Sequence, residues 1–332
     1  MSITIKELSE ISGYSAATIS RVVSKKGNVK KETREAIEKL LEMYQYSSKP
    51  KTGSDGGTDD PIIMVIIGEL HSYYYMELLS VIKSESGKYR IRMLIGFTDN
   101  SMEEEERYVR MAIEKQYAGL LFINVRGGEA LADILLHGNI PVVFLNRGIR
   151  FADFDAVIGD NYRGGYMITS YLIRMGHRKI GHLMGHTYSS AAQERRRGFE
   201  DAMNDAALPV TGNSVHVGEL TYESGYQYGE YLIKKGLDYT AVFCGNDTMA
   251  VGLRTALERA GVRVPEDISL VCYDDTLYAG NAGLTTVSAS PEKLASKAME
   301  MLYMKIQGKQ AEEGTVVYRP QITERNSVRK VI

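Results

Sequence analysis

The chain has 332 residues, of which 44% are hydrophobic and 25% charged, and its formal net charge is -2. This composition is typical of a globular protein, and the length favours two or three folding units. The longest apolar runs, such as residues 62–67, are far too short to span a bilayer, so we expect no membrane partner. The first residues lack the pattern of a secretory signal, so we expect a cytoplasmic protein.

Charge is unevenly distributed along the chain. Residues 1–51 carry ten Lys and Arg against six Asp and Glu, whereas the remaining residues carry thirty against thirty-six. The head is therefore about +4 and the body about -6. A small basic head on an acidic body predicts that the head binds a polyanion.

Three short helices are predicted within the first 46 residues. Residues 4–7, Thr-Ile-Lys-Glu, have the pattern of a capping box, Gly13 ends the first helix, and Ser15 can cap the second. A third helix is expected near residues 31–44. The apolar residues expected on the inner faces of the helices are Leu8, Ile11, Ile19, Val22, Val23, Ile37, Leu40, Leu41 and Tyr44. The pattern fits a trihelical DNA-binding module, and also a small helical cap whose charges only face solvent.

Residues 47–60 are polar and glycine-rich, which predicts a flexible linker. After Pro61, short apolar runs alternate with longer amphipathic stretches, which predicts an α/β core of parallel sheets covered on both faces. The runs are residues 62–67, 91–95, 119–123, 142–145, 180–184, 241–243 and 268–271. Residues 61–332 exceed one such domain, so we expect two doubly wound lobes with a ligand between the carboxyl ends of their strands.

Several stretches of the chain have a distinctive residue order. In the head they are residues 4–8, Gly13, 15–23, 28–29 and 32–34; in the core they are residues 160–164, 176–180, 195–199, 246–252, 264–269 and 273–275. These stretches closely resemble the LacI/GalR family of bacterial transcriptional regulators. They extend over nearly the whole chain except the linker.

The resemblance implies a helix-turn-helix head at residues 1–46 and a core at residues 61–332 similar to periplasmic sugar-binding proteins. The chain of such a core crosses between its lobes three times, here near Ile158, Ser288 and Arg319. Lobe 1 would comprise about residues 61–158 and 289–318, and lobe 2 about residues 159–288 and 319–332.

The resemblance also implies that residues 15–21 form the recognition helix in the major groove. The DNA-contacting residues it implies are Thr4, Ser15, Ala16, Ala17, Thr18, Arg21 and Asn28. The two alanines offer only a methyl contact, so base reading depends more on Ser15, Thr18 and Arg21. Asn28, with Lys25 and Lys30, is expected near phosphates.

For the effector, the resemblance implies contacts from Arg195, Asn246 and Asp274, and further contacts from Asn124 and Tyr74. Two opposite charges and an amide can bind adjacent sugar hydroxyls through charge-assisted hydrogen bonds. Each residue also has a simpler interpretation. Arg195 and Asp274 could form a salt bridge at a lobe surface, Tyr74 could pack inside its lobe, and Asn124 could only form a turn.

The linker departs from the family pattern. Tyr46 matches, but the residues after it do not form the usual hinge helix, and no leucine occurs between Leu41 and Leu70. The minor-groove wedge that such a leucine supplies is therefore in doubt.

No phosphate loop, zinc pair or nucleophile elbow occurs, so we expect no enzyme, cofactor or metal. His177 is explained by a helix C-terminus rather than catalysis, and Cys244 and Cys272 by burial in strands. The sequence favours a repressor of a carbohydrate operon that binds a palindromic operator as a homodimer or dimer of dimers and responds to a sugar. A sugar-transport protein and a sugar-modifying enzyme are the alternatives. The head and the missing secretory signal disfavour the first, and the lack of a recognisable catalytic pair disfavours the second.

Overall fold

The computed structural model describes residues 5–23, 29–44, 60–68, 73–148, 152–309 and 314–331. It divides into two compact units, Met1–Thr52 and Gly53–Ile332. Of the predicted linker, only Asp60 falls in the described ranges. Thr4 and Asn28, both expected to contact DNA, lie outside the described residues, as does Lys25.

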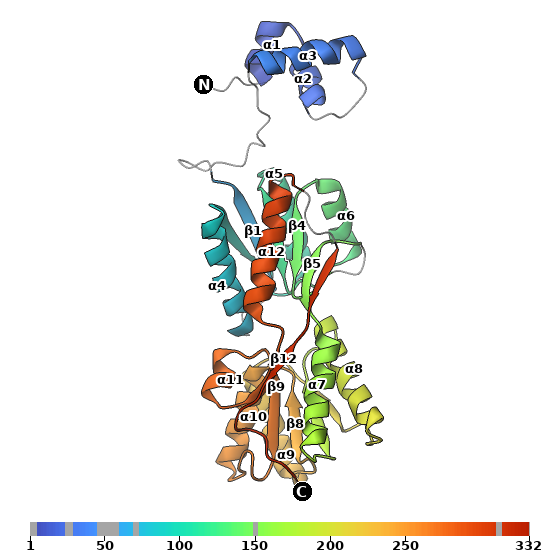
Figure 1. Ribbon diagram of the computed structural model, residues 1–332, viewed down its shortest axis with the longest axis vertical. Coiled ribbons are helices and arrows are strands. Elements are labelled where there is room, and N and C mark those ends of the chain that lie inside the picture. The colour runs from blue at the N-terminus through green and yellow to red at the C-terminus, as the bar shows by residue number, and fades with distance from the viewer. Residues whose placement is uncertain are drawn as a thin grey trace. The chain divides into compact units, whose positions relative to one another are not determined.

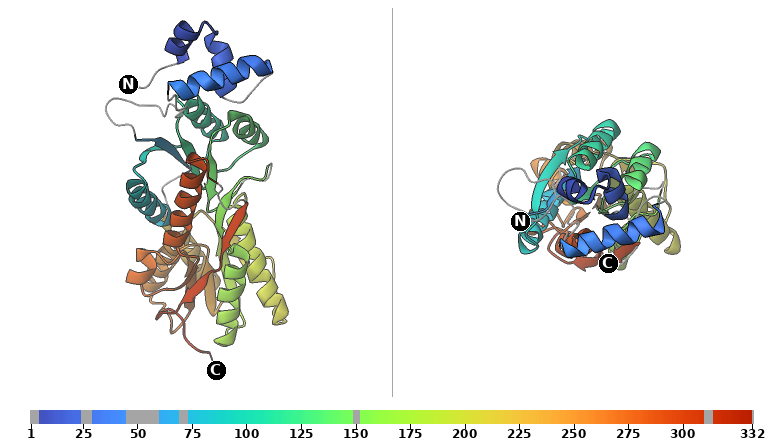
Figure 2. Two further views of the ribbon diagram at one scale, coloured as in Figure 1. Left: turned by 45° about the horizontal axis from the view of Figure 1, so that its top comes forward. Right: turned by 90° about the horizontal axis from the view of Figure 1, so that it is seen from above.

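The first unit contains the three predicted helices, α1 (Ile5–Ser12), α2 (Ala16–Val23) and α3 (Lys31–Met43). They form a compact bundle (Figure 2). The Ser15 hydroxyl accepts a hydrogen bond from the Thr18 amide at 3.2 Å, so Ser15 caps α2 as predicted. The bundle buries Leu8, Ile19, Val22 and Ile37.

Two residues of the predicted head core are exposed instead. Ile11 lies in the last turn of α1 and Tyr44 lies just after α3, and both side chains face solvent. Helices of 8, 8 and 13 residues enclose a core only about one layer deep, which leaves these terminal positions outside it.

The second unit contains two six-stranded sheets, each of which belongs to one lobe (Figure 1). The first sheet has the order β11-β5-β4-β3-β1-β2, and all its pairs are parallel. Its strands are β1 (Ile62–Ile67), β2 (Arg92–Phe97), β3 (Gly119–Ile123), β4 (Val142–Leu145), β5 (Ala156–Gly159) and β11 (Thr315–Tyr318).

The second sheet has the order β12-β10-β9-β8-β6-β7. Its strands are β6 (Ile180–Met184), β7 (Val215–Val217), β8 (Ala241–Cys244), β9 (Ser269–Tyr273), β10 (Thr285–Ser288) and β12 (Gln321–Thr323). The prediction of purely parallel sheets is wrong at β12, which pairs antiparallel with β10. The chain enters β12 directly from β11 of the other sheet, so it arrives from the opposite direction.

Helices cover both faces of each sheet, as the apolar strand runs predicted. They are α4 (Tyr73–Lys88), α5 (Met102–Glu114), α6 (Glu129–Gly138), α7 (Asn161–Arg174), α8 (Ser190–Asp205), α9 (Tyr222–Lys235), α10 (Asp247–Arg259), α11 (Leu277–Asn281) and α12 (Pro291–Ile306). In lobe 1, α4 and α12 pack on one face and α5 and α6 on the other; in lobe 2, α7 and α8 face α9 and α10 across the sheet.

The chain crosses between the sheets three times. It leaves the first sheet after β5, returns after β10 to form α12 and β11, and ends in the second sheet with β12. Figure 2 shows β11 lying beside β5, far from it in sequence. Three crossings hold the lobes next to each other, with the carboxyl ends of the parallel strands of both sheets facing one cleft.

Strand β2 differs from the fully covered strand that its apolar sequence predicted. It forms the edge of the first sheet, and Leu94, Ile95 and Phe97 are 42%, 39% and 43% exposed. Apolar side chains on an open sheet edge are unusual for a surface that only meets water.

Candidate effector site and DNA-binding face

A polar cavity lies between the two lobes, where the strands of both sheets end. It has about 500 Å³ of empty volume, part of which is open solvent. Its lining residues are Tyr74, Tyr75, Asn124, Asn146, His182, Met184, Gly185, Ser189, Ala191, Ala192, Arg195, Leu220, Gly245 and Asp274. Four of the five predicted effector residues are therefore brought together here: Tyr74, Asn124, Arg195 and Asp274.

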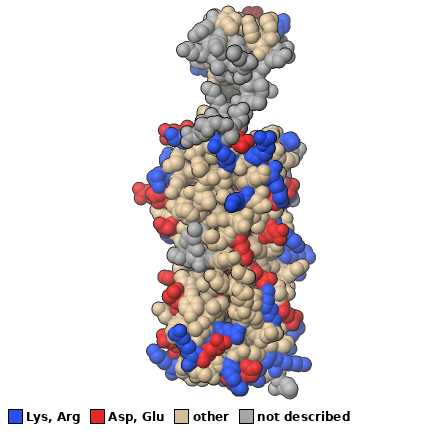
Figure 3. Space-filling view, turned by 90° about the vertical axis from the view of Figure 1, so that its left-hand side faces the viewer, with Lys and Arg blue, Asp and Glu red and all other residues tan. Residues whose placement is uncertain are grey.

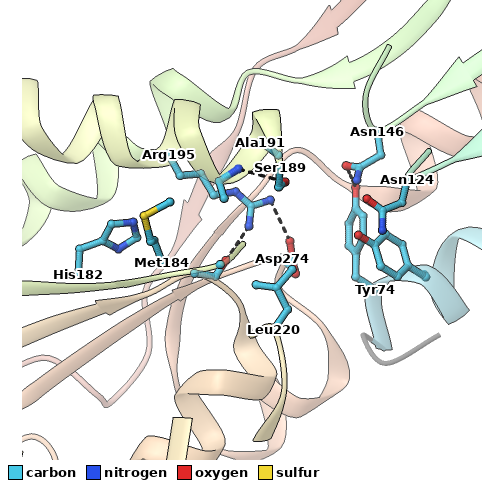
Figure 4. Close-up of a pocket in the computed structure, with 14 residues that line it drawn as sticks. Tyr74, Asn124, Asn146, His182, Met184, Ser189, Ala191, Arg195, Leu220 and Asp274 are labelled. Carbon is cyan, nitrogen blue, oxygen red and sulfur yellow. Dashed lines mark hydrogen bonds and ion pairs between the residues drawn. The ribbon is translucent and has the colours of Figure 1, made fainter. Parts of the chain in front are cut away.

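Arg195 projects from the first half of α8 and is fixed by several neighbours (Figure 4). Its Nε donates to Asn161 Oδ1 at 2.8 Å, and its Nη1 donates to the Gly245 carbonyl at 2.6 Å. The guanidinium carbon lies 3.5 Å from the centre of the Tyr273 ring. These contacts hold the guanidinium in one orientation before any ligand binds.

The position of Arg195 also depends on how closely α7 and α8 approach. A Cβ added at Gly165 of α7 would lie 2.2 Å from the Arg195 carbonyl oxygen. A Cβ at Gly198 of α8 would lie equally close to the Tyr162 carbonyl oxygen. Only glycine at both positions lets the helices pack at this distance and bring Arg195 to the cavity.

Asp274 follows β9 and forms an ion pair with Arg195, with Nη2 and Oδ1 3.5 Å apart. The two side chains are 8% and 11% exposed, so the pair lies in the cavity wall and not at a lobe surface. Burial raises the pKa of Asp274, and the Arg195 charge partly offsets this effect. Behind Asp274, Asp247 accepts hydrogen bonds from Thr276 and Thr286, and burial followed by the Asp274 charge raises its pKa.

Lobe 1 supplies an aromatic ring and two amides. The Tyr74 hydroxyl donates to Asn146 Oδ1 at 3.4 Å, and Tyr74 also packs into the lobe core. Asn124 follows β3 and Asn146 follows β4, and both have a positive φ, 57° and 74°. For both residues the two interpretations from the sequence hold together. Tyr74 packs in its lobe and also lines the cavity, and Asn124 forms a turn and also lines the cavity.

His182 lines the cavity but was not predicted from the sequence. Its Nδ1 lies 2.9 Å from the Phe243 carbonyl oxygen, which can only accept, so Nδ1 carries the proton. In the neutral ring Nε2 is then an acceptor, and it has no partner within the described residues. Burial lowers the pKa of His182 to about 4, so the ring is neutral near pH 7.

Asn246, the fifth predicted effector residue, does not line this cavity. Its Oδ1 accepts from the Met249 amide at 2.8 Å and caps α10, and its Nδ2 donates to the Leu220 carbonyl at 3.2 Å. Both functions of the amide are therefore used within the protein. Its role is to fix the start of α10 beside the cavity.

Asn146 and His182 were missed for different reasons. Asn146 follows the apolar run 142–145 just as Asn124 follows 119–123, so the same rule would have identified it. His182 lies inside an apolar run, where sequence gives no sign that one ring edge meets a cavity.

The head presents α2 as its candidate DNA-binding surface. The side chains of Ser15, Ala16 and Arg21 are exposed, and that of Thr18 is half-buried. The side chain of Ala17 is not among those that the structure describes. The opposite side of the helix carries the buried Ile19 and Val22. One face of α2 is therefore anchored in the bundle and the other is open.

Comparison with known proteins agrees with this architecture. Residues 4–49 match the LacI family of bacterial regulatory proteins, and residues 169–328 match a periplasmic binding protein-like domain. The HTH-type transcriptional repressor PurR of Vibrio atlanticus is 30% identical over 329 residues, 98% of each chain. This chain belongs to the LacI family. PurR of Erwinia tasmaniensis is 31% identical over 98% of this chain and 96% of that protein.

Solved LacI-family structures share the fold. A transcriptional regulator CelR–cellobiose complex superposes with a TM-score of 0.74 and 24% identity, covering 98% of this chain and 99% of that one. The lac repressor dimer bound to operator and the anti-inducer ONPF has a TM-score of 0.73 and 23% identity over 99% and 100% of the chains.

Family membership defines the general function. The chain is a DNA-binding transcriptional repressor and not an enzyme, as the sequence predicted. Within the described ranges, no helix is both long and apolar enough to cross a membrane, and no three His, Cys, Asp or Glu side chains are placed to hold a metal ion. His177 is buried, and its Nδ1 lies 3.0 Å from Thr240 Oγ1. Both cysteines are buried free thiols, as expected.

Proposed function

We propose that this repressor controls a carbohydrate-utilisation operon and that a small sugar or sugar derivative binds between its lobes. The observation that carries the proposal is the ion pair of Arg195 and Asp274 in the wall of the cavity between the lobes. Asn124 and Tyr74 face this pair from the other lobe (Figure 4).

The chemistry of the cavity suits a polyhydroxylated ligand. Asp274 accepts hydrogen bonds, Arg195 donates them, and an amide such as that of Asn124 does both, so adjacent hydroxyls find partners of both kinds. The similar CelR structure is described as a cellobiose complex, which supports a carbohydrate ligand. The relatives named PurR do not add to this support, because their name does not refer to a sugar.

Ligand contacts from both lobes explain how binding would control DNA affinity. A ligand shifts a conformational equilibrium only by its differential affinity for the two states. Because the cavity lies between lobes joined by three chain crossings, a ligand that favours one lobe arrangement changes the state of the whole core.

On the DNA side, the proposal assigns base reading to Ser15, Thr18 and Arg21 on the open face of α2, with Ala16 and Ala17 beside them. Thr4 and Asn28, outside the described residues, complete the proposed contact set. A single recognition helix reads a half-site, so we infer a palindromic operator and a homodimer acting in the cytoplasm.

A surface of the core supports the homodimer. Met76 of α4 and Leu277 and Tyr278 of α11 are exposed, as are the apolar residues of β2. Figure 3 shows the side that carries α4 and α11, where large areas of both lobes have no charged side chains. Exposed apolar side chains on both lobes fit contact with a second copy of the chain, and the related lac repressor is described as a dimer on operator.

The ligand site is tested with Arg195→Ala and Asp274→Ala. Each removes a charged hydrogen-bonding partner, so effector affinity should fall about ten- to a hundredfold or more, while operator binding without effector survives. Sugars are titrated into a complex of the full chain with a fluorescent operator. If both variants release DNA at the wild-type sugar concentration, the effector binds elsewhere.

A further inference from the structure

The cavity around Arg195 and Asp274 continues into a wider mouth between the same lobes. In three places successive residues line first the cavity and then the mouth: Asn124 and Val125, Asn146 and Arg147, and Ser189 and Ser190. The mouth has about 1560 Å³ of empty volume, including open solvent. A ligand held inside can therefore extend one end into the mouth.

Arg147 lines this mouth and is largely buried. It is only 9% exposed, and within the described ranges its side chain makes no hydrogen bond or ion pair. Its Nε is fully enclosed without a partner. Glu105, a nearby carboxylate, instead accepts from the amides of Arg126 and Gly127 at 2.8 and 3.0 Å. A buried guanidinium loses hydration, and the nearby Glu105 carboxylate offsets this only through space, because within the described residues it forms no ion pair with Arg147.

The other arginines of the mouth have partners. Arg196 pairs with Glu200 at 2.6 Å, and Arg197 pairs with Glu194 at 2.7 Å. Arg126 donates to the Asn100 carbonyl and lies over the Tyr188 ring. Among these arginines, Arg147 is the one without a hydrogen-bond or ion-pair partner within the described residues, so an anion from outside the chain could bind it directly.

The start of α8 lines the same mouth from lobe 2. Ser190, its first residue, lines the mouth, and the first turn of this 16-residue helix has no acidic side chain. The Ser189 side chain already accepts from the Ala192 amide, and the helix dipole still favours an anion at this end. An anion between Arg147 and α8 would be stabilised from both lobes.

We propose that the mouth binds an anionic group of the effector, a phosphate or a carboxylate, between Arg147 and the start of α8. The hydroxyl-bearing part of the same molecule binds Arg195 and Asp274 in the inner cavity. The inference rests on the proposed function and narrows the effector to an acidic sugar derivative.

The test compares hexose phosphates and hexuronates with their neutral parent hexoses, and with inorganic phosphate, by calorimetry on the full chain at constant ionic strength. An acidic sugar should bind at least about tenfold more tightly than its parent. Arg147→Gln should remove that advantage and leave the affinity for the parent unchanged. Arg196→Gln is the matched control, because its arginine lies in the same mouth but already pairs with Glu200.

A second variant separates ligand binding from a structural role. Arg147→Met keeps the length of the side chain and removes an unpaired buried charge, so without ligand its melting temperature should equal or exceed that of the wild type. A lower melting temperature would mean that Arg147 stabilises the fold, and would overturn the inference.

Failure of the inference can be distinguished from failure of the proposed function. If neutral sugars bind as tightly as their acidic derivatives and weaken operator binding, the anion site is wrong and the proposed function stands. If no sugar, acidic or neutral, binds or alters operator binding, both are wrong.

Discussion

The Arg195 side chain is largely buried, and it still presents hydrogen-bond donors to the cavity. Asn161, Gly245 and the Tyr273 ring fix the guanidinium, and Asp274 balances its charge. The Nη2–Oδ1 distance of 3.5 Å is long for a charge-assisted hydrogen bond, so the pair retains capacity for a ligand. A site fixed in advance loses less entropy when it binds.

In the head, the residue with the clearest expected effect is Arg21. It is exposed on the open face of α2, and its removal leaves the buried Ile19 and Val22 intact. If Arg21 contacts a base edge, Arg21→Ala should weaken specific operator binding by about 1–3 kcal/mol and leave effector affinity unchanged. Fluorescence anisotropy on operator and random DNA measures both; an equal loss on the two would make Arg21 a phosphate contact.

His182 gives the core a defined pH dependence. Its pKa of about 4 lies below the unfolded value near 6.5, so the unfolded chain takes up a proton first as the pH falls. The stabilisation from the neutral ring is present above about pH 6.5 and is lost as the pH falls towards 4. At pH 5 the loss is about 2 kcal/mol.

The pH dependence of the wild type is compared with that of the variant His182→Asn. The Asn amide can still donate to the Phe243 carbonyl, but it does not titrate. Denaturant unfolding at pH 7 and pH 5 should show a larger loss of stability in the wild type. Asp247 and Asp274, whose raised pKa values act in the opposite direction, are common to both proteins. Equal losses in both proteins would rule out His182 as the source.

At the scale of elements, α10 shows that a residue of a predicted ligand-binding stretch can also cap a helix. Asn246 begins a stretch that resembles the family's ligand-binding motifs, yet its side chain caps the helix and holds Leu220, itself a lining residue of the cavity. Asn246→Ala should therefore destabilise lobe 2 by about 1–2 kcal/mol. Asn246→Asp retains the acceptor that caps α10 and should recover part of this loss.

Stability and ligand affinity separate the two roles of Asn246. Urea unfolding measures the first, and calorimetry with the effector measures the second. We expect Asn246→Ala to change affinity far less than Arg195→Ala does, since Arg195 lines the cavity and Asn246 does not. An equal loss of affinity would make Asn246 a ligand contact after all.

Much of the element structure could be predicted because local patterns determine it. The caps and apolar periodicity of the head identified α1, α2 and α3, and unbroken apolar runs identified the buried strands of both sheets. Edge effects could not be predicted. Arg92 and Gly96 interrupt the apolar sequence of β2, but they do not show which of its apolar residues are exposed, because exposure depends on which strand ends the sheet.

Some residues of the site could be predicted from the sequence and others could not. Arg195 and Asp274 were reached through resemblance, because residues 79 positions apart meet only through the sheet order and the close α7–α8 packing. Arg147 was not singled out by the sequence, since an arginine after a strand is ordinary until its burial and lack of a partner are known. Local pattern therefore predicts elements better than it predicts the chemistry between them.

At the scale of the whole molecule, the exposed apolar surface of the core and the half-site reading of the head lead to one expectation. Phe97 of β2 is a 43% exposed aromatic side chain on an open sheet edge. A charge introduced there would be buried without a partner in any interface that used this edge. Phe97→Glu should therefore convert the proposed homodimer to a monomer.

Loss of the dimer should also weaken operator binding, because two linked heads gain affinity from their effective concentration, by about a hundredfold or more. Sedimentation velocity at micromolar concentration measures the oligomeric state, and operator titration measures affinity. Leu136→Glu on α6 is the matched control, since Leu136 is an apolar residue exposed on another part of lobe 1. It should stay dimeric with full affinity. A wild-type monomer with full operator affinity would contradict the homodimer. A Phe97→Glu protein that remains dimeric would show that the dimer contact does not involve this edge of β2.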